Sequence, residues 1–287
     1  MCGNPTQLSG FFFDSHNKNR SIYSTFKVSG ENSKRVSKEY IQMIIDMYGL
    51  DSDVYRVRVA GEFPKAMPDS FIQLDWVENC SNKKVKRNYS QSRIDIGVDV
   101  ARYGDDETII NTLFDKQYQQ PFTVLHHNDT MQVTGTIVQL VERLRAQHIG
   151  IPIHIKIDCD GLGVGVYDRL KEIKKQKNWT TVKLYECHFG AAGGKNKQED
   201  PVEFSNSTGL MWGLLREKLR RHEIELIYDD KQITQLSNRR YRINSDGKIE
   251  LERKEEMKKR GLTSPDRGDA LVLSLYEPKQ SGLSILK

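Results

Sequence analysis

The sequence has few cysteines and no long apolar run. Its four cysteines, in 287 residues, are scattered, and no two stand at the Cys-x-x-Cys spacing of a zinc site. A zinc centre and a disulfide framework are therefore not expected. A reducing compartment is expected instead. No stretch of about 18 apolar residues is present, which excludes a membrane-spanning helix. The first residues lack the basic and apolar regions of a secretory signal, so none is predicted.

The balance of charge is nearly even. Lysine and arginine together number 44 against 39 aspartates and glutamates, which gives a formal net charge of +5. Such a small excess permits a polyanionic partner without requiring one, so local clusters of charge matter more than the total. Hydrophobic residues make up 37% and charged residues 29%, the composition of a globular chain long enough for one large domain or two smaller ones.

Residues 94–278 alternate between strand-like and helix-like patterns. The expected strands are 94–100, 108–114, 122–126, 151–157 and 181–185, and the expected helices are 132–147, 164–176, 205–221 and 265–276. Three successive strands followed by alternating helices and strands predict an α/β fold, with a mixed β-sheet flanked by helices. This order is typical of the RNase H-like fold. The turn residues at 244–247 separate two further strand-like segments, 239–243 and 248–252, which predicts an auxiliary β-hairpin.

The first 80 residues differ from this pattern. A helix is expected over 38–48, with Ser37 as its N-cap and Gly49 at its end, followed by a short strand at 55–59. The polar stretch that begins at Asn79 is rich in lysine and arginine and is expected to be an exposed linker. The predicted organisation is therefore a first domain at 1–80, a linker at 81–93, a second domain at 94–278 and a tail at 279–287.

Two of the expected strands end with an aspartate. In 94–100 the isoleucines and valines share one face, and Asp99 lies on the other. In 151–157 the isoleucines again share a face, and the next residue, Asp158, opposes them. Glycines follow both acids, so the chain is expected to turn just beyond each one.

Two more acids stand at the expected start of the last helix. Asp266 and Asp269 are three residues apart and share a helix face, with Ser264 as the expected N-cap and Pro265 as the expected first helical residue. The helix dipole favours ionised carboxylates at this end. Together with the two strand ends, this gives three acidic positions that are far apart in the chain.

Carboxylates at these positions fit the hydrolysis of a phosphodiester. Two divalent ions about 3.5–4 Å apart can hold the attacking and leaving oxygens, and Mg²⁺ prefers oxygen ligands. An isolated aspartate is nevertheless more often a turn or cap residue. Asp105, Asp106 and Asp160 are interpreted as loop residues, although Asp160 could also support a metal ligand. The histidines are interpreted as surface or buried structural residues rather than metal ligands. The pattern by itself permits a metal-dependent nuclease without requiring one.

Five segments resemble the large terminase subunit of tailed bacteriophages. The segments 94–108, 157–163 and 264–271 resemble its nuclease motifs and occur in the family's order. The segments 3–12 and 56–64 resemble the end of its ATPase domain. The resemblance covers nearly the whole chain, and it implies an RNase H-like nuclease that cuts concatemeric viral double-stranded DNA during genome packaging.

The resemblance also implies particular roles for residues, cofactors and partners. Asp99, Asp158 and Asp269 would be catalytic and would bind Mg²⁺ or Mn²⁺, with two ions expected. Asp266 would be a further metal ligand, and how Asp266 and Asp269 divide their roles is open. The implied partners are viral double-stranded DNA, the portal protein, the small terminase subunit and the missing ATPase part of the large subunit, in the host cytoplasm and with no membrane.

One departure from the family is large. No Gly-x-x-x-x-Gly-Lys-Ser/Thr loop occurs, so no ATPase activity is expected from this chain alone. We therefore expect a fragment or the product of a split gene. Two other interpretations stay open: another RNase H-like nuclease, such as a junction resolvase or a transposase, or a catalytically silent DNA-docking module of the packaging motor.

Contact with DNA is expected from basic side chains of a glycine-rich loop and of the predicted hairpin. The candidates are Lys195, Lys197, Arg239, Arg240 and Arg242. Phosphate contacts dominate such binding, although charge runs of this kind are often only solvated. The stretch 254–260 is a weaker candidate, because Glu255 and Glu256 dilute its positive charge.

Overall fold

The computed structural model describes residues 3, 5, 11–50, 55–63, 70–82, 92–101, 106–195 and 202–278. The chain divides into two compact units. The first unit comprises 1–71, 192–210 and 239–253, and the second comprises 72–191, 211–238 and 254–287. Most of the predicted linker and the whole predicted tail lie outside the described residues, so the predicted domain limits stay a prediction.

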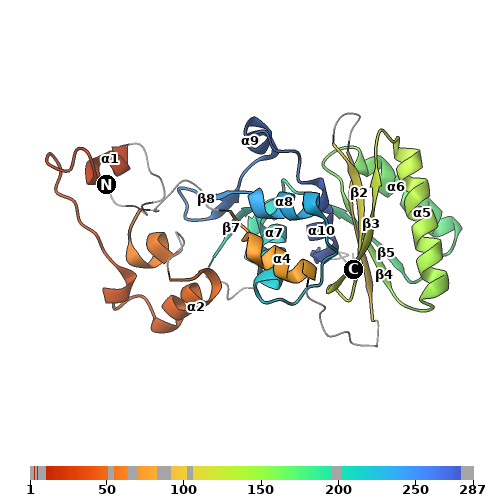
Figure 1. Cartoon of the computed structure of the whole chain (residues 1–287), viewed down its shortest axis with the longest axis horizontal. Helices are drawn as coiled ribbons and strands as arrows, with labels where there is room; N and C mark the ends of the chain where they lie inside the picture. Colours follow the sequence, from red (N-terminus) through yellow and green to blue (C-terminus); the bar gives the residue numbers. More distant parts are fainter. Residues whose placement is uncertain are drawn as a thin grey trace, which may run out of the picture. The chain divides into compact units, whose positions relative to one another are not determined.

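The second unit is built on a mixed five-stranded sheet with the order β3-β2-β1-β4-β5 (Figure 1). Its strands are β1 (Ile94–Asp99), β2 (Thr108–Phe114), β3 (Tyr118–Leu125), β4 (Ile153–Asp158) and β5 (Val182–Cys187). The first three pair antiparallel, and β1, β4 and β5 pair parallel. The prediction of an α/β fold with a mixed sheet is confirmed. The third strand starts at Tyr118 rather than at 122, because β3 is an edge strand and edge strands tolerate the proline at position 121.

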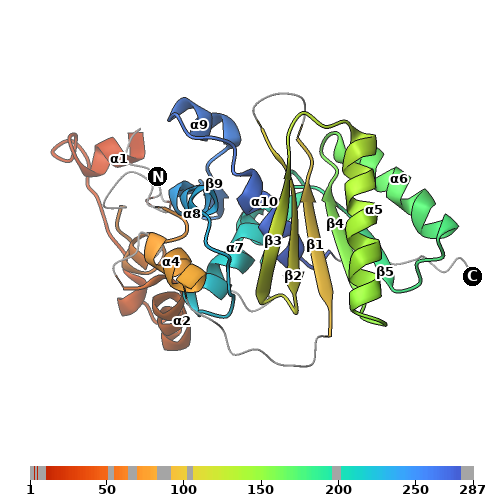
Figure 2. The same cartoon turned by 45° about the vertical axis from the view of Figure 1, so that its right-hand side comes forward.

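Two helices cover one face of this sheet, α5 (Thr130–Gln147) and α6 (Gly163–Gln176), as Figure 2 shows. The aliphatic side chains of β1 and β4 that the sequence assigns to one face lie in the core beneath these helices. The helices contribute residues at helical spacing, including Val133, Ile137, Val141, Val166 and Leu170. The apolar alternation of the sequence therefore specifies this side of the sheet.

The last helix, α10 (Asp266–Leu275), covers the opposite face. It lies so close to β1 that a Cβ atom added at Gly97 would overlap the carbonyl oxygen of Ala270. The side chain of Lys156 is fully buried on this face, where its Nζ pairs with Asp95 and donates to the carbonyl of Ser274 at 2.9 Å. Glycine thus permits the close approach, and the buried lysine ties the end of α10 to the sheet.

Further helices of the second unit are α4 (Leu74–Asn82), α8 (Asp230–Asn238) and α9 (Lys254–Lys259), and α7 (Ser207–Arg220) continues into it from the first unit. α4 reaches into the stretch that was expected to be linker from Asn79. Val77 and Cys80 stand three residues apart in α4 and are both buried, so the polar composition conceals an amphipathic helix.

The first unit contains α1 (Phe11–His16), η1 (Gly30–Asn32), α2 (Lys38–Tyr48) and η2 (Arg56–Ala60). The predicted helix of α2 is confirmed: the Ser37 side chain accepts from Tyr40 N, and Gly49 follows the last turn with φ 86°. The expected strand at 55–59 is wrong, because the segment forms one turn of π-helix. Val57 and Val59 are both buried in that turn, so burial at alternate positions imitates a strand.

A second sheet, with the order β6-β7-β9-β8, also belongs to the first unit. Its strands are β6 (Ala192–Gly194), β7 (Phe204–Asn206), β8 (Tyr241–Ile243) and β9 (Ile249–Leu251). The predicted hairpin is confirmed, since β8 pairs antiparallel with β9 and Gly247 adopts φ 73° in the turn. Throughout the described residues, no helix has both the length and the apolar character needed to cross a membrane.

Candidate functional site

Two of the predicted acids meet at one edge of the main sheet. β1 and β4 are parallel neighbours, and their register runs from Ile94 opposite Ile153 to Val98 opposite Ile157. The next residue of each strand is the aspartate, so Asp99 and Asp158 stand side by side where the strands end. Ligands of α/β sheets bind beyond the carboxyl ends of parallel strands. Only 5% of Asp99 is exposed, so its carboxylate depends on its neighbours for solvation.

Asp269 joins this edge from the first turn of α10. It is 1% exposed, and both of its carboxylate oxygens have partners: Oδ1 accepts from Trp212 Nε1 at 2.9 Å, and Oδ2 accepts from Lys254 Nζ at 2.8 Å. The close packing of α10 on β1 at Gly97 delivers this carboxylate toward the end of β1. The structure thus brings the three predicted catalytic acids to one place.

Lys254, the first residue of α9, puts its ammonium among these acids. Its Nζ lies 2.8 Å from Asp269 Oδ2 and 3.8 Å from Asp99 Oδ2. Partial burial would lower the pKa of Lys254, but the attraction of Asp269 and Asp99 outweighs it and raises the pKa above its ordinary value. The ammonium is therefore a permanent cation of this cluster.

Asp99 and Asp158 still have raised pKa values. Burial raises the pKa of Asp99 well above its ordinary value; Lys254 opposes that shift, while Asp269, Asp266 and Asp158 reinforce it. Burial also raises the pKa of Asp158 to about 6, against a backbone hydrogen bond from Asp160 that favours the ionised form. One ammonium is thus too little positive charge for the carboxylates gathered here, and more positive charge would be bound favourably.

Asp266 has a different setting from Asp269. Its Oδ2 accepts from the backbone N of Glu107 at 2.9 Å, so it holds the chain just before β2. Ser264 is not the N-cap: α10 begins at Asp266 after a non-helical Pro265, and the Ser264 side chain hydrogen-bonds Asp266 instead. Burial raises the pKa of Asp266, while the bonds from Ser264 and Glu107 favour its ionised form.

Two contributors to the site were missed by the sequence reasoning. In the sequence, Lys254 is only one residue of a basic stretch diluted by glutamates, and Trp212 is only one residue of an expected helix. Neither carries a local signal, since each reaches Asp269 through tertiary packing. By contrast, Asp160 has the loop role expected of it, because it accepts from His188 Nδ1 at 2.7 Å and from Gly190 N at 3.0 Å and ties two loops together.

The donor set at the site suits a hard cation. Among the residues that the structure describes, no three His, Cys, Asp or Glu side chains form a ready set of metal ligands. The carboxylate oxygens of Asp99 and Asp269 are instead engaged by the Lys254 ammonium, which stands in for a cation. Oxygen donors around a bound cation are the chemistry that Mg²⁺ or Mn²⁺ requires, so the residues fit a divalent ion that replaces the ammonium.

The predicted DNA-contacting residues lie in the first unit, and their settings differ. Arg239 is 3% exposed and donates from Nε to the carbonyl of Glu252, so its side chain supports the hairpin. Arg242 is exposed and pairs with Glu250 at 2.9 Å. Arg240 is half-buried, and Lys195 is exposed with Glu203 at 4.0 Å. Lys197 lies outside the described residues.

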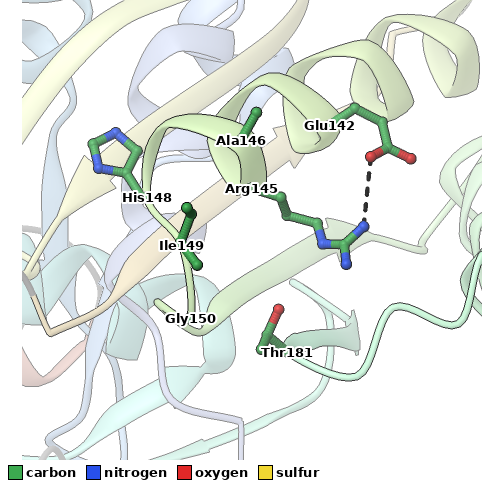
Figure 3. A pocket seen from close by; sticks show the side chains of 7 residues that line it. All are labelled: Glu142, Arg145, Ala146, His148, Ile149, Gly150 and Thr181. Atoms are coloured by element: carbon green, nitrogen blue, oxygen red, sulfur yellow. Dashed lines mark hydrogen bonds and ion pairs between the residues drawn. The ribbon is translucent and has the colours of Figure 1, made fainter.

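A pocket elsewhere in the second unit is distinct from this site. It lies where α5 ends, at the start of β4 and β5, and its lining includes Glu142, Arg145, His148 and Thr181 (Figure 3). Arg145 Nη1 lies 3.5 Å from Glu142 Oε2 within it. The acids stand at the other end of β4, so the pocket does not belong to the carboxylate cluster.

Comparison with known proteins finds similar sequences and structures. No protein-family profile matches the chain. The chain is 27% identical over 304 residues to the probable terminase large subunit of Enterobacteria phage P7, and it spans 59% of that protein's length. The nuclease domain of the large terminase subunit gp2 of bacterial virus Sf6 matches 73% of the chain and all of its own length, with TM-score 0.60 and 17% identity.

Two further structures extend this likeness. A lysine-to-alanine variant of the Sf6 domain, solved with calcium, matches the same share of the chain with TM-score 0.59 and 17% identity. The large terminase of a thermophilic bacteriophage matches 96% of this chain and 62% of its own, with TM-score 0.51 and 10% identity.

The fold is thus the RNase H-like α/β fold of the large terminase nuclease domains, with a cluster of carboxylates at the edge of its main sheet. The sequence is similar to that of a probable terminase large subunit from a bacteriophage, in agreement with the resemblance.

Proposed function

We propose that the chain is a divalent-metal-dependent endonuclease that cleaves concatemeric viral double-stranded DNA during genome packaging, as the nuclease part of a terminase large subunit. The observation that carries the proposal is the convergence of Asp99, Asp158 and Asp269 at one edge of the main sheet, with the Lys254 ammonium beside Asp269 and Asp99. The fold and the phage relative support the same function.

Asp99, Asp158 and Asp269 would hold the metal, Mg²⁺ or Mn²⁺, and we propose two ions. When bound, such ions activate water and stabilise the charge that develops on the phosphate. Asp266 is proposed to support the site through the backbone of Glu107, leaving Asp269 as the acid of α10 that meets the metal. Trp212 orients Asp269 from behind.

Lys254 would compete with a metal ion for the carboxylate oxygens of the site. Without metal, its ammonium offsets part of the repulsion between Asp99 and Asp269, and it favours the ionised form of Asp99. A divalent ion that uses the same oxygens must displace this ammonium. We therefore propose that metal binding moves the Lys254 side chain out of the cluster.

DNA would be bound through phosphate contacts of basic side chains, for which the exposed Lys195 and Arg242 and the half-buried Arg240 are proposed. Arg239 is left out because its guanidinium is buried. The ATPase part of the large subunit, the portal protein and the small terminase subunit are proposed as partners on the strength of the phage relative, of which this chain spans 59%.

The test of this function is cleavage of supercoiled plasmid by the purified chain in Mg²⁺ or Mn²⁺, with and without EDTA. Asp99→Asn should abolish cleavage, because it removes a charge from the centre of the cluster. Asp106→Asn is the matched control: Asp106 is an exposed aspartate that pairs with Lys258, and its loss should leave cleavage unchanged. Cleavage that survives in Asp99→Asn would refute the assignment of the site.

A catalytically silent DNA-docking module is the second candidate, since Lys254 already neutralises part of the cluster. It predicts that the wild-type chain binds DNA but shows no heat of binding with Mn²⁺ and no cleavage. Selective cutting of branched DNA or strand transfer would instead point to a resolvase or a transposase.

A further inference from the structure

The indole of Trp212 lies behind the acid that α10 brings to the site. Trp212 belongs to α7 and is fully buried, and its Nε1 donates to Asp269 Oδ1 at 2.9 Å. An indole N–H is only a donor and has one fixed direction. This bond therefore fixes the orientation of the Asp269 carboxylate without adding charge to the cluster.

The packing around the indole holds it in this position. A Cβ atom added at Gly268 would stand 2.8 Å from Cη2 and 2.9 Å from Cζ2 of Trp212, and 3.3 Å from Leu236. The absence of a side chain at Gly268 thus lets the ring lie directly against the first turn of α10. The ring cannot turn without displacing α10, so the bond to Asp269 is enforced by packing.

The consequence for Asp269 is an unequal use of its two oxygens. Oδ1 accepts the hydrogen bond from the indole, whereas Oδ2 pairs with the Lys254 ammonium. Oδ2 is therefore the oxygen that faces a cation. A carboxylate held in this way presents one oxygen to a metal. Mg²⁺ demands a small octahedral shell, while Ca²⁺ readily takes six to eight oxygens, including both oxygens of one carboxylate.

We propose that Trp212 is a positioning residue that restricts Asp269 to one metal-binding oxygen and thereby favours Mg²⁺ and Mn²⁺ over Ca²⁺. The inference rests on the proposed metal-dependent function and names the residue that would set the metal preference of the site. Partners that orient a ligand in this way are worth about 10- to 100-fold in metal affinity.

The test is calorimetric titration of Mn²⁺ and of Ca²⁺ into the full chain carrying Trp212→Phe, which removes the N–H and keeps an aromatic ring. The Mn²⁺ affinity should fall about 10-fold or more, and the ratio of Ca²⁺ to Mn²⁺ affinity should rise. Trp179→Phe is the matched control, because Trp179 is also buried and donates from Nε1 to Glu142 at 3.2 Å, away from the acids. It should change neither affinity.

A measurement on the wild-type chain keeps the inference testable if Trp212→Phe does not fold. The chain has three tryptophans, so three indole N–H signals are expected in a nitrogen–proton correlation spectrum, and single substitutions of Trp76 and Trp179 identify the third. Mg²⁺ should shift the Trp212 signal and leave the Trp179 signal in place.

The outcomes separate this inference from the proposed function. A wild-type chain that binds Mn²⁺ and cleaves DNA, with an unchanged ratio of affinities in Trp212→Phe or a Trp212 signal that ignores Mg²⁺, would overturn the role of Trp212 alone. A wild-type chain that binds no metal would overturn the proposed function, and the inference with it.

Discussion

At the scale of single residues, the proposed metal site has a lysine ammonium beside the carboxylate oxygens that a metal ion would use. The Lys254 ammonium bonds Asp269 and lies near Asp99, and both are acids that a metal would need. The lysine side chain is 38% exposed, so it has a route to solvent when a metal arrives. The apparent metal affinity is then the intrinsic affinity reduced by the cost of displacing the lysine.

Replacing Lys254 by alanine should therefore tighten Mn²⁺ binding while weakening the metal-free fold. We expect the Mn²⁺ concentration at half-saturation to fall several-fold in calorimetry, because no ammonium competes. The melting temperature in EDTA should drop, since Asp99 and Asp269 then repel each other, and Mn²⁺ should restore it.

Lys258→Ala is the control for this prediction, because Lys258 lies on the same short helix but pairs with the exposed Asp106. It should alter neither the Mn²⁺ affinity nor the response to EDTA. An unchanged Mn²⁺ affinity in Lys254→Ala would mean that the ammonium and the metal do not share a place.

Asp158 gives a prediction for pH. Burial raises its pKa to about 6 in the folded chain, above the ordinary value for an aspartate, so folding disfavours its ionised form. The contribution of Asp158 to the free energy of unfolding is fully present below its pKa in the unfolded chain, and it is lost as the pH rises through about 6. In EDTA, Asp158→Asn should raise the melting temperature at pH 7.5 and give no gain at pH 4.

Thermal unfolding followed by circular dichroism at both pH values checks this. A gain of the same size at pH 4 and pH 7.5 would show that ionisation of Asp158 is not its cause. Metal-dependent cleavage should be lost in the same variant, which would make Asp158 a case of stability given up for function.

At the scale of secondary-structure elements, the site depends on how closely α10 approaches β1. Gly97 lies against the carbonyl of Ala270, one residue beyond Asp269, and precedes Asp99 by two. Lys156 ties the other end of α10 to the sheet through the carbonyl of Ser274. The distance between the acids is therefore set by backbone packing along the whole helix.

Gly97→Ala should break this approach. The new Cβ atom would overlap the Ala270 carbonyl oxygen and stand 2.5 Å from Ser274 N, and backbone must move to relieve it. We expect a loss of about 1–3 kcal/mol or more in the free energy of unfolding, together with weaker Mn²⁺ binding.

Denaturant unfolding and calorimetry measure the two effects. Gly135→Ala provides the contrast, because Gly135 lies within α5 and nothing would meet its Cβ atom within 4 Å. That substitution should stabilise the chain by about 0.5–1 kcal/mol and leave Mn²⁺ binding unchanged. A Gly97→Ala chain as stable as the wild type would show that α10 can shift at no cost.

At the scale of the whole chain, two of the similar proteins are longer than this chain. The terminase of the thermophilic bacteriophage matches 96% of this chain with 62% of its own, and the P7 relative is likewise longer than this chain. The match thus covers one part of each of these longer proteins. The proposed partners all concern this larger assembly, which is why DNA cleavage by the isolated chain is the first experiment.

The sequence by itself determined the main sheet, its apolar face and the aspartates at the ends of two of its strands. These features are local or periodic: alternating isoleucines and valines choose a face, and an aspartate at the end of each of two strands lies where parallel neighbours must bring it to one edge. Alternate burial in the π-turn at 56–60 misled the same reasoning, because period two is not unique to strands.

Only the tertiary structure decided what surrounds those acids. Lys254 and Trp212 reach Asp269 across segments that are distant in the chain, and no spacing in the sequence encodes such contacts. The separate setting of Asp266 depends in the same way on the backbone of Glu107. Charge, hydrogen bonding and close packing act through space, so they became visible only once α7, α9 and α10 were placed around the edge of the sheet.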